Sequence, residues 1–571
     1  MASQNINANM FDRGIYGADT GSYENGGAQV VPLPLNLIAL IISYLDQPAD
    51  LARTCRTCRV LHYMTLPQLY SNVSLRSYDY IRYSPLTGRP EGCGGASPFS
   101  MGLNGLVTRS IAGYVRKFRL WGEFKEYDLE ECAKVGRVPD GSMMLNCLVR
   151  AAVEKMGVLE SFSWELDTKM LPTVWQGLAQ KQTLTSLAVK FPSVRLPRPT
   201  VLVPPIPSLK SLRITDIDPL CYPDDISLLL LDSRKLRDLT LHWNPRMRSA
   251  REPSVSLHAY FGRLVSRQHQ LTLRSITFAN LYATNNGGFD GVVDPKKLEE
   301  ITFINSTGGA GDSGETAFID LSWQMHSHKE IPSPKMIRGD KISRQHCEWL
   351  GANLVGLERY YLIGATQPCE RKRNGQRVRT PSDNVNPYPS TPVPSTPSTP
   401  IDPTAVSLGK DYLDLVCKNH GSTLRHLLLK PQWRLSSEDL GRLVRCCPNL
   451  EQLGVGVEVA DLDIICILMP FLPKLSALRI LEDPHNGAFA EAMKRVDDAF
   501  RENDMGPELA KPEYSQLRWL GLGDMVFEVK GLVRLGEVDT NGENFIMRDI
   551  KRASREDVQH VEIWGMDSME I

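Results

Sequence analysis

Several residues have side chains that bind metal ions, and their spacing decides whether they could do so together. Cys55-x-x-Cys58 has the spacing of half a zinc site, but no second pair of Cys or His residues follows at a suitable distance. His326-Ser327-His328 and His346-Cys347 could contribute ligands only if folding gathered them. Both sulfurs of the Cys55 pair fall on the apolar face of a predicted helix, so we interpret them as core residues and expect no metal and no cofactor.

A glycine-rich loop carries a short sequence that could belong to a hydrolase. Gly311-Asp312-Ser313-Gly314 is similar to the nucleophile loop of chymotrypsin-like proteases, but the His and Asp motifs that complete such a site do not surround it. A glycine-rich phosphate cradle of the Walker type does not occur either. We therefore expect no catalytic residues, and a hydrolase is the least supported alternative.

Length and charge limit the classes of partner. The chain has 571 residues, far more than one ordinary domain, so either several domains or a repeat array is expected. Its 65 Lys and Arg residues balance 66 Asp and Glu residues, and the net charge of -1 gives no global attraction to nucleic acid or to a membrane. The densest apolar stretch, residues 37–42, is far shorter than the roughly 18 residues that cross a bilayer. We expect neither nucleic acid nor a membrane among the partners.

The N-terminus and the cysteines predict the cellular location. Residues 1–30 are rich in Asn, Gly and Ser, and we expect a disordered segment. They lack the basic start and apolar run of a secretory signal, so the protein should stay inside the cell. The 12 cysteines show no regular framework of spacings, which fits reduced thiols inside a cell. We expect a location in the cytoplasm, the nucleus or both.

Residues 31–75 predict a small helical unit with more apolar surface than it can bury. Residues 31–45 are typical of a helix, with Pro34 in its first turn and Pro48 beyond its end. Apolar side chains occupy both sides of this helix, which predicts that it is covered on both sides.

Two further helices are predicted, from residue 49 to about residue 60 and from residue 60 to residue 66, where Pro67 ends the third. Residues 69–75 should then be extended, like a strand. Three short helices bury too little surface to be stable alone, so either the following residues or another protein should cover the surplus apolar face.

This pattern resembles the F-box, especially as it is written in fungal proteins. The residues that carry the resemblance are Leu33-Pro34, Leu37-Ile38, Ile41-Ile42, Tyr44-Leu45, Leu51, Cys55, Cys58, Leu61-His62-Tyr63 and Leu69-Tyr70. The resemblance implies docking onto the Skp-type adaptor of a cullin-RING ubiquitin ligase and, through the adaptor, onto a cullin. The adaptor contacts that it implies are Leu33, Pro34, Leu37, Ile38, Ile41, Leu45 and Leu51. The alternative is a helical cap that closes the first repeat.

The rest of the chain contains many copies of the form Leu-x-x-Leu-x-Leu, in which other apolar residues can substitute. The copies begin at Val115, Leu159, Leu184, Leu209, Leu236, Leu273, Leu298, Leu357, Leu424, Leu450, Leu475, Leu517 and Val558. Several successive copies are about 25 to 27 residues apart, which matches a leucine-rich repeat. Residues 144–156, 225–231, 257–267 and 437–446, which lie between copies, are compatible with helices.

The predicted fold class is α/β, with a short three-helix F-box unit (residues 31–75) followed by an irregular leucine-rich-repeat solenoid of parallel strands and helices (residues 76–366 and 407–571). Cys446-Cys447-Pro448-Asn449-Leu450 resembles the junction of cysteine-containing leucine-rich repeats, a type that often accompanies F-boxes, and we interpret both cysteines as core. Candidates to face a substrate are Arg213, Thr240, Thr277, Thr302 and Arg479. The irregularity of the repeats leaves a helical-repeat or split α/β fold as the alternative.

Residues 367–406 interrupt the array with a change of composition. Arg371-Lys372-Arg373 and Arg377-Val378-Arg379 precede a run of Ser, Thr and Pro. Such a run buries too little apolar surface to compensate for the conformational entropy lost on ordering, so we predict a disordered insertion. Thr380, Thr391, Thr396 and Thr399 each precede proline, so a proline-directed kinase could phosphorylate them, unless the segment is an unmodified linker. The basic cluster could be a nuclear import signal or part of a solvated loop.

Together these features predict a non-catalytic substrate receptor of an SCF-type ubiquitin ligase. The F-box-like helices would hold the Skp-type adaptor, and the repeats would hold a protein substrate whose identity the sequence does not encode. The alternative is a leucine-rich-repeat interaction scaffold without ligase activity, in which the N-terminal helices cap the solenoid.

Overall fold

The computed structural model describes residues 34–83, 97–191, 203–218, 223–244, 255–304, 334–363, 403–458, 468–481 and 505–568, with short gaps inside several of these ranges. The chain divides into two compact units, Met1–Ser211 and Leu212–Ile571. Each is an α/β arrangement in which mostly parallel strands and helices follow one another in a solenoid-like manner, as predicted. The predicted disordered N-terminus (1–30) and almost all of the predicted insertion (367–406) lie outside the described residues.

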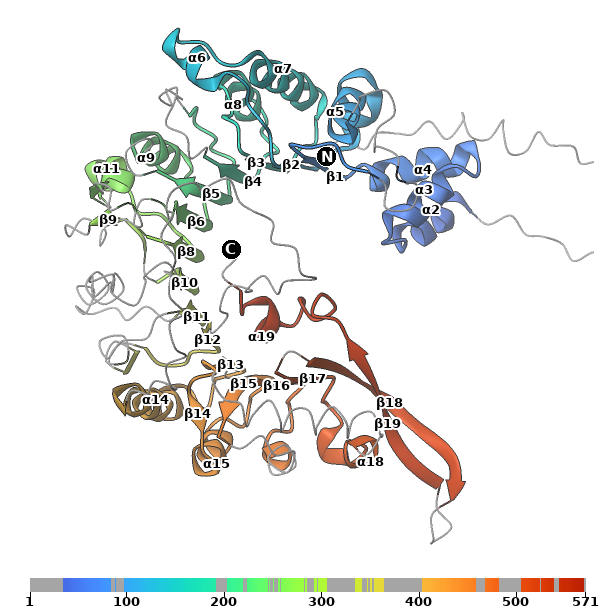
Figure 1. Ribbon diagram of the computed structural model, residues 1–571, viewed down its shortest axis with the longest axis vertical. Coiled ribbons are helices and arrows are strands. Elements are labelled where there is room, and N and C mark those ends of the chain that lie inside the picture. Colours follow the sequence, from blue (N-terminus) through green and yellow to red (C-terminus); the bar gives the residue numbers. More distant parts are fainter. Residues whose placement is uncertain are drawn as a thin grey trace, which may run out of the picture. The chain divides into compact units, whose positions relative to one another are not determined.

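The first unit begins with three short helices, as predicted (Figure 1): α2 (Leu35–Ser43), α3 (Pro48–Cys55) and α4 (Arg59–Leu69). The third helix was expected to end at Pro67, but α4 continues through it to Leu69. Pro67 has no amide hydrogen, so α4 has one backbone hydrogen bond fewer there and ends two residues later. The Gln68 side-chain amide donates to the Leu45 carbonyl oxygen at 2.8 Å, which ties α4 to the end of α2.

Four strands of the first unit pair in parallel: β1 (Asn72–Ser77), β2 (Lys117–Gly122), β3 (Ser161–Leu166) and β4 (Ser186–Lys190). β1 crosses the predicted domain boundary at residue 75, so strand pairing connects the helical unit directly to the array. The helices between the strands are α5 (Pro98–Thr108), η2 (Ser110–Tyr114), α6 (Leu129–Lys134), α7 (Asp140–Lys155) and α8 (Pro172–Ala179). Phe118 and Phe162 meet edge to face in the core, with ring centroids 5.8 Å apart.

The second unit contains a longer ladder of parallel strands. Its members are β5 (Ser211–Ile217), β6 (Asp238–Trp243), β8 (Ser275–Ala279), β10 (Glu300–Ile304), β11 (Met336–Gly339), β12 (Arg359–Leu362), β13 (His426–Leu428), β15 (Gln452–Val457), β16 (Ala477–Leu481) and β17 (Trp519–Leu522). β14 (Arg434–Leu435) pairs with β15, and β7 (Val255–Ser256) pairs with β9 (Ala283–Thr284). β18 (Met525–Val538) and β19 (Asn544–Ala553) continue from β17 as an antiparallel hairpin.

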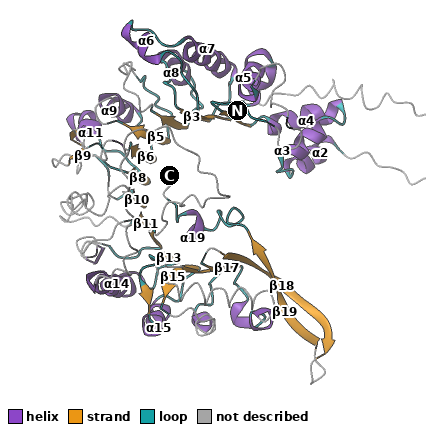
Figure 2. Cartoon of the chain, viewed as in Figure 1, coloured by secondary structure: helices purple, strands orange, loops and turns teal. Residues whose placement is uncertain are grey.

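The helices of the second unit lie on two sides of its strands (Figure 2). α9 (Pro223–Asp232), α11 (His258–Ser266), α14 (Pro403–Leu415) and α15 (Ser437–Cys446) lie on one side, whereas α19 (Glu562–Gly565) lies on the other. The remaining helical turns are η3 (Val416–His420), η4 (Met469–Phe471), α18 (Met505–Glu508) and η5 (Pro512–Tyr514). α14 begins at Pro403, slightly before the predicted end of the insertion at residue 406.

The leucine motif predicted most strand positions correctly. Each strand begins two residues after the leading residue of its motif, as β6 does after Leu236 and β15 does after Leu450. The motif at Val558 is a wrong prediction, because it leads into α19 and not into a strand. Strand β11 and the antiparallel hairpin were not predicted.

The register of the ladder aligns one buried apolar side chain from each of nine strands, β6 to β17, into a row. This row contains Leu239, Ile276, Ile301, Ile337, Tyr360, Leu427, Leu453, Leu478 and Leu520. Because side chains alternate between the two faces of a strand, the residues before and after each of these point to the opposite face. The leucine period therefore fixes which strand residues can meet a partner.

Candidate protein-interaction sites

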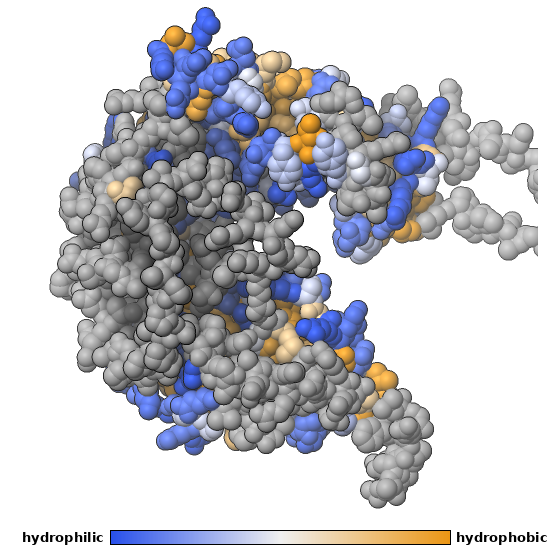
Figure 3. Space-filling view, in the orientation of Figure 1, coloured by the Kyte–Doolittle hydropathy of each residue, from blue (hydrophilic) through white to orange (hydrophobic). Residues whose placement is uncertain are grey.

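Helix α2 buries one side in the three-helix unit and exposes the other. Ile42 is 4% exposed, whereas Ile41 is 56%, Leu40 52% and Leu37 41% exposed. Apolar atoms beside α2 come to the surface in the space-filling view (Figure 3). The predicted surplus of apolar surface is therefore present, and these three residues stay exposed among the residues that the structure describes.

The predicted adaptor contacts differ in accessibility. Pro34 is exposed, and Ile38 and Leu45 are half-buried. Leu51 is only 4% exposed because α3 turns it into the interior of the three helices. Against the prediction, Leu51 packs the unit and offers no surface contact, and Leu33 lies outside the described residues.

Cys55 and Cys58 make polar contacts at helix ends. The Cys55 sulfur lies 3.0 Å from His62 Nδ1, and the Cys58 sulfur accepts a hydrogen bond from the Leu61 amide in the first turn of α4. Cys58 is exposed, so the interpretation of both cysteines as core residues is wrong for this one. Cys447 of the second predicted pair is buried, as predicted, and Cys446 is half-buried.

A second candidate site lies on the strands of the second unit, on the face opposite the leucine row. One row on this face contains Asp238, Ser275, Glu300, Met336, Arg359, His426, Gln452, Ala477 and Trp519, and the other contains Thr240, Thr277, Thr302, Arg338, Tyr361, Leu428, Gly454, Arg479 and Gly521. We call these two rows the inner face. It is the face that α19 covers (Figure 1).

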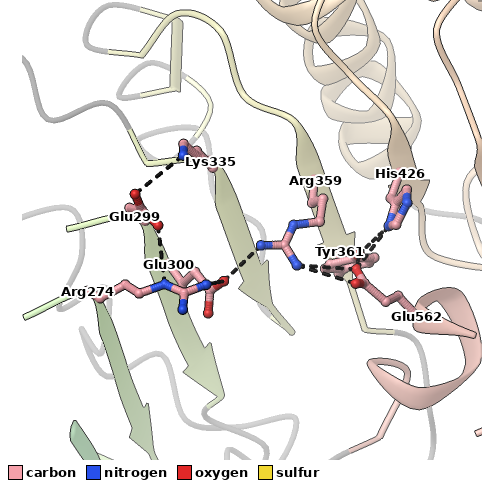
Figure 4. A network of polar contacts seen from close by, with 8 residues as sticks. All are labelled: Arg274, Glu299, Glu300, Lys335, Arg359, Tyr361, His426 and Glu562. Atoms are coloured by element: carbon pink, nitrogen blue, oxygen red, sulfur yellow. Dashed lines mark hydrogen bonds and ion pairs between the residues drawn. The ribbon is translucent and has the colours of Figure 1, made fainter. Parts of the chain in front are cut away.

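A network of charged side chains crosses the first row (Figure 4). Arg359 Nη2 lies 2.8 Å from Glu300 Oε1, and Glu300 also faces Arg274 at 3.4 Å. Arg274 contacts Glu299 at 3.2 Å, and Glu299 contacts Lys335 at 3.3 Å. Positively and negatively charged side chains therefore alternate through this network. Their ion pairs restrict the conformations of the long side chains.

The network ends at Glu562, a residue of α19 rather than of the strands (Figure 4). His426 Nδ1 donates to Glu562 Oε2 at 2.9 Å, the Tyr361 hydroxyl donates to the same oxygen, and Arg359 Nη1 lies 3.4 Å from it. The pKa of Glu562 is lowered to about 2. The largest cause is the hydrogen bond from His426, and the hydrogen bond from Tyr361 and the positive charge of Arg359 add to it. Burial and the nearby Glu562 raise the pKa of Tyr361, so that its hydroxyl stays protonated as a donor.

The predicted substrate-facing residues lie on strands, but few of them are open to solvent. Thr277 and Thr302 are buried, whereas Arg213 and Thr240 are half-buried. Arg479 is covered by the C-terminal end of the chain, where it contacts Asp567 at 2.8 Å. Thr240, Thr277, Thr302 and Arg479 share one row of the inner face, so the prediction grouped them correctly.

Sequence reasoning missed the residues that hold α19. Arg338, Arg359, Tyr361 and His426 carry most of these contacts. The available signal was their position: Tyr361 follows a leading leucine by four residues, like the candidates that were selected, and Arg359 and His426 follow one by two residues, which places them on the same face. Arg338 lies on β11, whose motif was not recognised.

Other predicted features cannot be located. Thr380, Thr391, Thr396 and Thr399, the Gly311-Asp312-Ser313-Gly314 loop and the histidines at 326, 328 and 346 lie outside the described residues. Among the residues that the structure describes, no cluster of three or more His, Cys, Asp or Glu side chains could hold a metal ion. The helices within those same residues are too short or too polar to cross a membrane.

Comparison with known proteins finds similarity to solved structures. No family model and no curated protein matches the chain. A solved structure described as the crystal structure of the Rad7 and Elc1 complex in yeast contains a chain that is similar to this one, with 14% sequence identity and a TM-score of 0.36, over 79% of this chain and 87% of that chain.

Proposed function

We propose that the protein is the substrate-recognition subunit of a cullin-RING ubiquitin ligase of the SCF type. In this proposal α2 and its neighbours bind a Skp-type adaptor that connects to a cullin, and the repeats bind a substrate protein. The chain itself contributes positioning and no catalytic residues. It would act in the cytoplasm, the nucleus or both.

The observation that carries the proposal is the exposed apolar side of α2. Leu37, Leu40 and Ile41 stay between 41% and 56% exposed in a unit of three short helices placed ahead of a repeat array. Exposed apolar groups of this kind, rimmed by polar residues, mark protein interaction sites. A helical cap on the repeats would instead bury these side chains against the chain itself.

The energetics require more than α2 alone. Full burial of the three exposed side chains, Leu37, Leu40 and Ile41, contributes at most about 5 to 9 kcal/mol gross. Association costs about 4 to 15 kcal/mol, so this helix by itself gives little surplus. Tyr44 and Tyr63 are 76% and 58% exposed, and we include them in the proposed adaptor surface.

Adaptor capture tests the proposal directly. The full chain should retain a purified Skp-type adaptor in a pull-down, and Leu37→Asp with Ile41→Asp should abolish retention while thermal unfolding stays unchanged. Leu532→Asp with Val533→Asp is the matched control, because these residues of β18 are similarly exposed, at 58% and 44%, but belong to the hairpin. A wild-type chain that retains no adaptor would leave the scaffold alternative.

A further inference from the structure

The last described segment of the chain, residues 558–568, packs onto the inner face. Val558, Ile563 and Trp564 are almost fully buried and belong to one core cluster with Tyr361. A Cβ atom built on Gly521 would lie 2.6 Å from Trp564 Cζ2, so the indole ring approaches the backbone of β17 where only glycine leaves room. The inner face thus accommodates an aromatic ring next to Gly521.

Two arginines of the second row hold the segment by its backbone and by one carboxylate. Arg338 donates from Nε to the Met566 carbonyl at 2.9 Å and from Nη2 to the Ser568 carbonyl at 2.5 Å. Arg479 donates from Nη1 to the Ile563 carbonyl at 3.0 Å and to Asp567 Oδ2 at 2.8 Å. In the first row, the Gln452 side-chain oxygen accepts from the Ile563 amide at 3.1 Å.

The contact is asymmetric in charge. The strands contribute the guanidinium groups of Arg338, Arg359 and Arg479, whereas the segment contributes the carboxylates of Glu562 and Asp567. Arg359 is also paired with Glu300 of strand β10, at 2.8 Å. A buried cation that loses its acceptors is strongly destabilised. The inner face therefore favours an occupant that brings carboxylates or other acceptors to Arg338 and Arg479.

The segment is attached in a way that permits its replacement. None of residues 558–568 pairs with a strand, and their regular structure is the single turn of α19. A helix of this length is not stable alone, so its conformation depends on the inner face. The segment is joined to the second unit through β19, and its departure would break none of the strand pairings described above.

We propose that this part of the inner face is a binding site for an acidic, aromatic-containing segment of a partner protein, and that residues 558–568 occupy it in cis until the partner replaces them. The recognised features are a carboxylate at the place of Glu562, an indole at the place of Trp564 and a second carboxylate at the place of Asp567. This inference rests on the proposed function in taking the partner as the substrate.

A direct binding experiment tests the inference on the full chain. The probe is a fluorescein-labelled synthetic peptide with the sequence of residues 558–568, and the readout is fluorescence anisotropy. A segment tethered in cis competes at an effective concentration of about millimolar, so the wild-type chain should bind micromolar probe poorly. Glu562→Gln with Asp567→Asn weakens the cis occupant and should tighten probe binding by about tenfold or more.

Three controls show whether the gain in probe binding has the proposed cause. Asp549→Asn with Glu556→Gln removes two exposed carboxylates outside the contact and should leave probe binding at the wild-type level. A probe in which alanine replaces Trp564, or Gln and Asn replace the two acids, should lose the gained affinity. Adding Arg479→Met to the double variant should lose it as well.

A second measurement covers the case in which the double variant does not fold. Hydrogen exchange of residues 558–568 in the wild-type chain should become faster when unlabelled peptide is added in large excess. If exchange stays unchanged, or if a folded double variant does not bind the probe, the segment is a permanent cap and the inference is overturned. Adaptor capture is measured separately on the same samples, so its success or failure distinguishes the proposed function from this inference.

Discussion

His426 donates a hydrogen bond of 2.9 Å to Glu562, a residue 136 positions further along the chain. The first residue opens strand β13 and the second opens α19. Their contact therefore reports whether the C-terminal segment is seated on the inner face.

This contact predicts an acid dependence of stability. The pKa of Glu562 is lowered from 4.5 to about 2 by His426, Tyr361 and Arg359. A lowered carboxyl pKa stabilises the folded chain at pH values above its unfolded pKa, and this stabilisation is lost as the pH falls from about 4.5 through about 2. Thermal unfolding between these pH values should show a steeper loss in the wild-type chain than in Glu562→Gln. Parallel profiles would contradict the prediction.

The two isoleucines at the end of α2 should differ in their effect on stability. Ile42 is 4% exposed and Ile41 is 56% exposed. Ile42→Ala should lower the free energy of unfolding of the helical unit by about 2 to 5 kcal/mol, because it leaves a cavity. Ile41→Ala should change it by less than about 0.5 kcal/mol. Urea denaturation measures both values, and equal losses would mean that α2 packs differently.

Gly521 should be intolerant of a side chain. A methyl group there would lie 2.6 Å from Trp564 Cζ2 and 3.0 Å from Arg479 Cγ, so Gly521→Ala should cost about 1 to 3 kcal/mol and increase hydrogen exchange in residues 558–568. Gly441→Ala in α15 is the matched control, because its Cβ would have open space and it should stabilise the helix by about 0.5 to 1 kcal/mol. Unchanged exchange in Gly521→Ala would show that Trp564 can shift without releasing the segment.

Cys417 should react with alkylating agents near neutral pH. A hydrogen bond from Cys447 lowers the pKa of the Cys417 thiol to about 7. The thiolate is the reactive form, so the rate of modification by iodoacetamide should rise with pH through about 7. Cys447→Ala removes the donor and should move this rise to higher pH. Mass spectrometry of the modified peptide follows the rate, and an identical profile in both proteins would contradict the assignment.

The strands were predictable because each places a buried apolar side chain at the same position of its motif, next to that of the neighbouring strand. The register aligns Leu239, Ile276 and Ile301, and a leucine-rich motif describes that alignment. β11 was missed because Pro334 occupies the buried position where the motif expects a leading leucine. Val558 matched the motif and is buried, but its segment packs as a helical turn, since short apolar patterns do not distinguish a turn from a strand.

The polar contacts of the inner face were not predictable in the same way. Arg338 and Ser568 are 230 residues apart, and nothing in the local pattern around either one indicates the other. The apolar helix α2 was a stronger signal, because a helix that is apolar on both sides has more apolar surface than three short helices can bury. Leu51 shows the limit of this reasoning, because the pattern did not say which leucines the unit would bury itself.

The two rows of the inner face also set the spacing at which a bound peptide meets side chains. Neighbouring strands lie about 4.8 Å apart, so a ligand that crosses them meets a new side chain at that interval. An extended chain returns a side chain to the same side only every 6.6 Å or so, whereas a helical turn does so about every 5.4 Å. The helical turn is the closer match to the strand spacing, and the turn that lies here, α19, brings Glu562 to His426 and Arg359 of adjacent strands. Peptides that cross this ladder should therefore bind in a helical conformation.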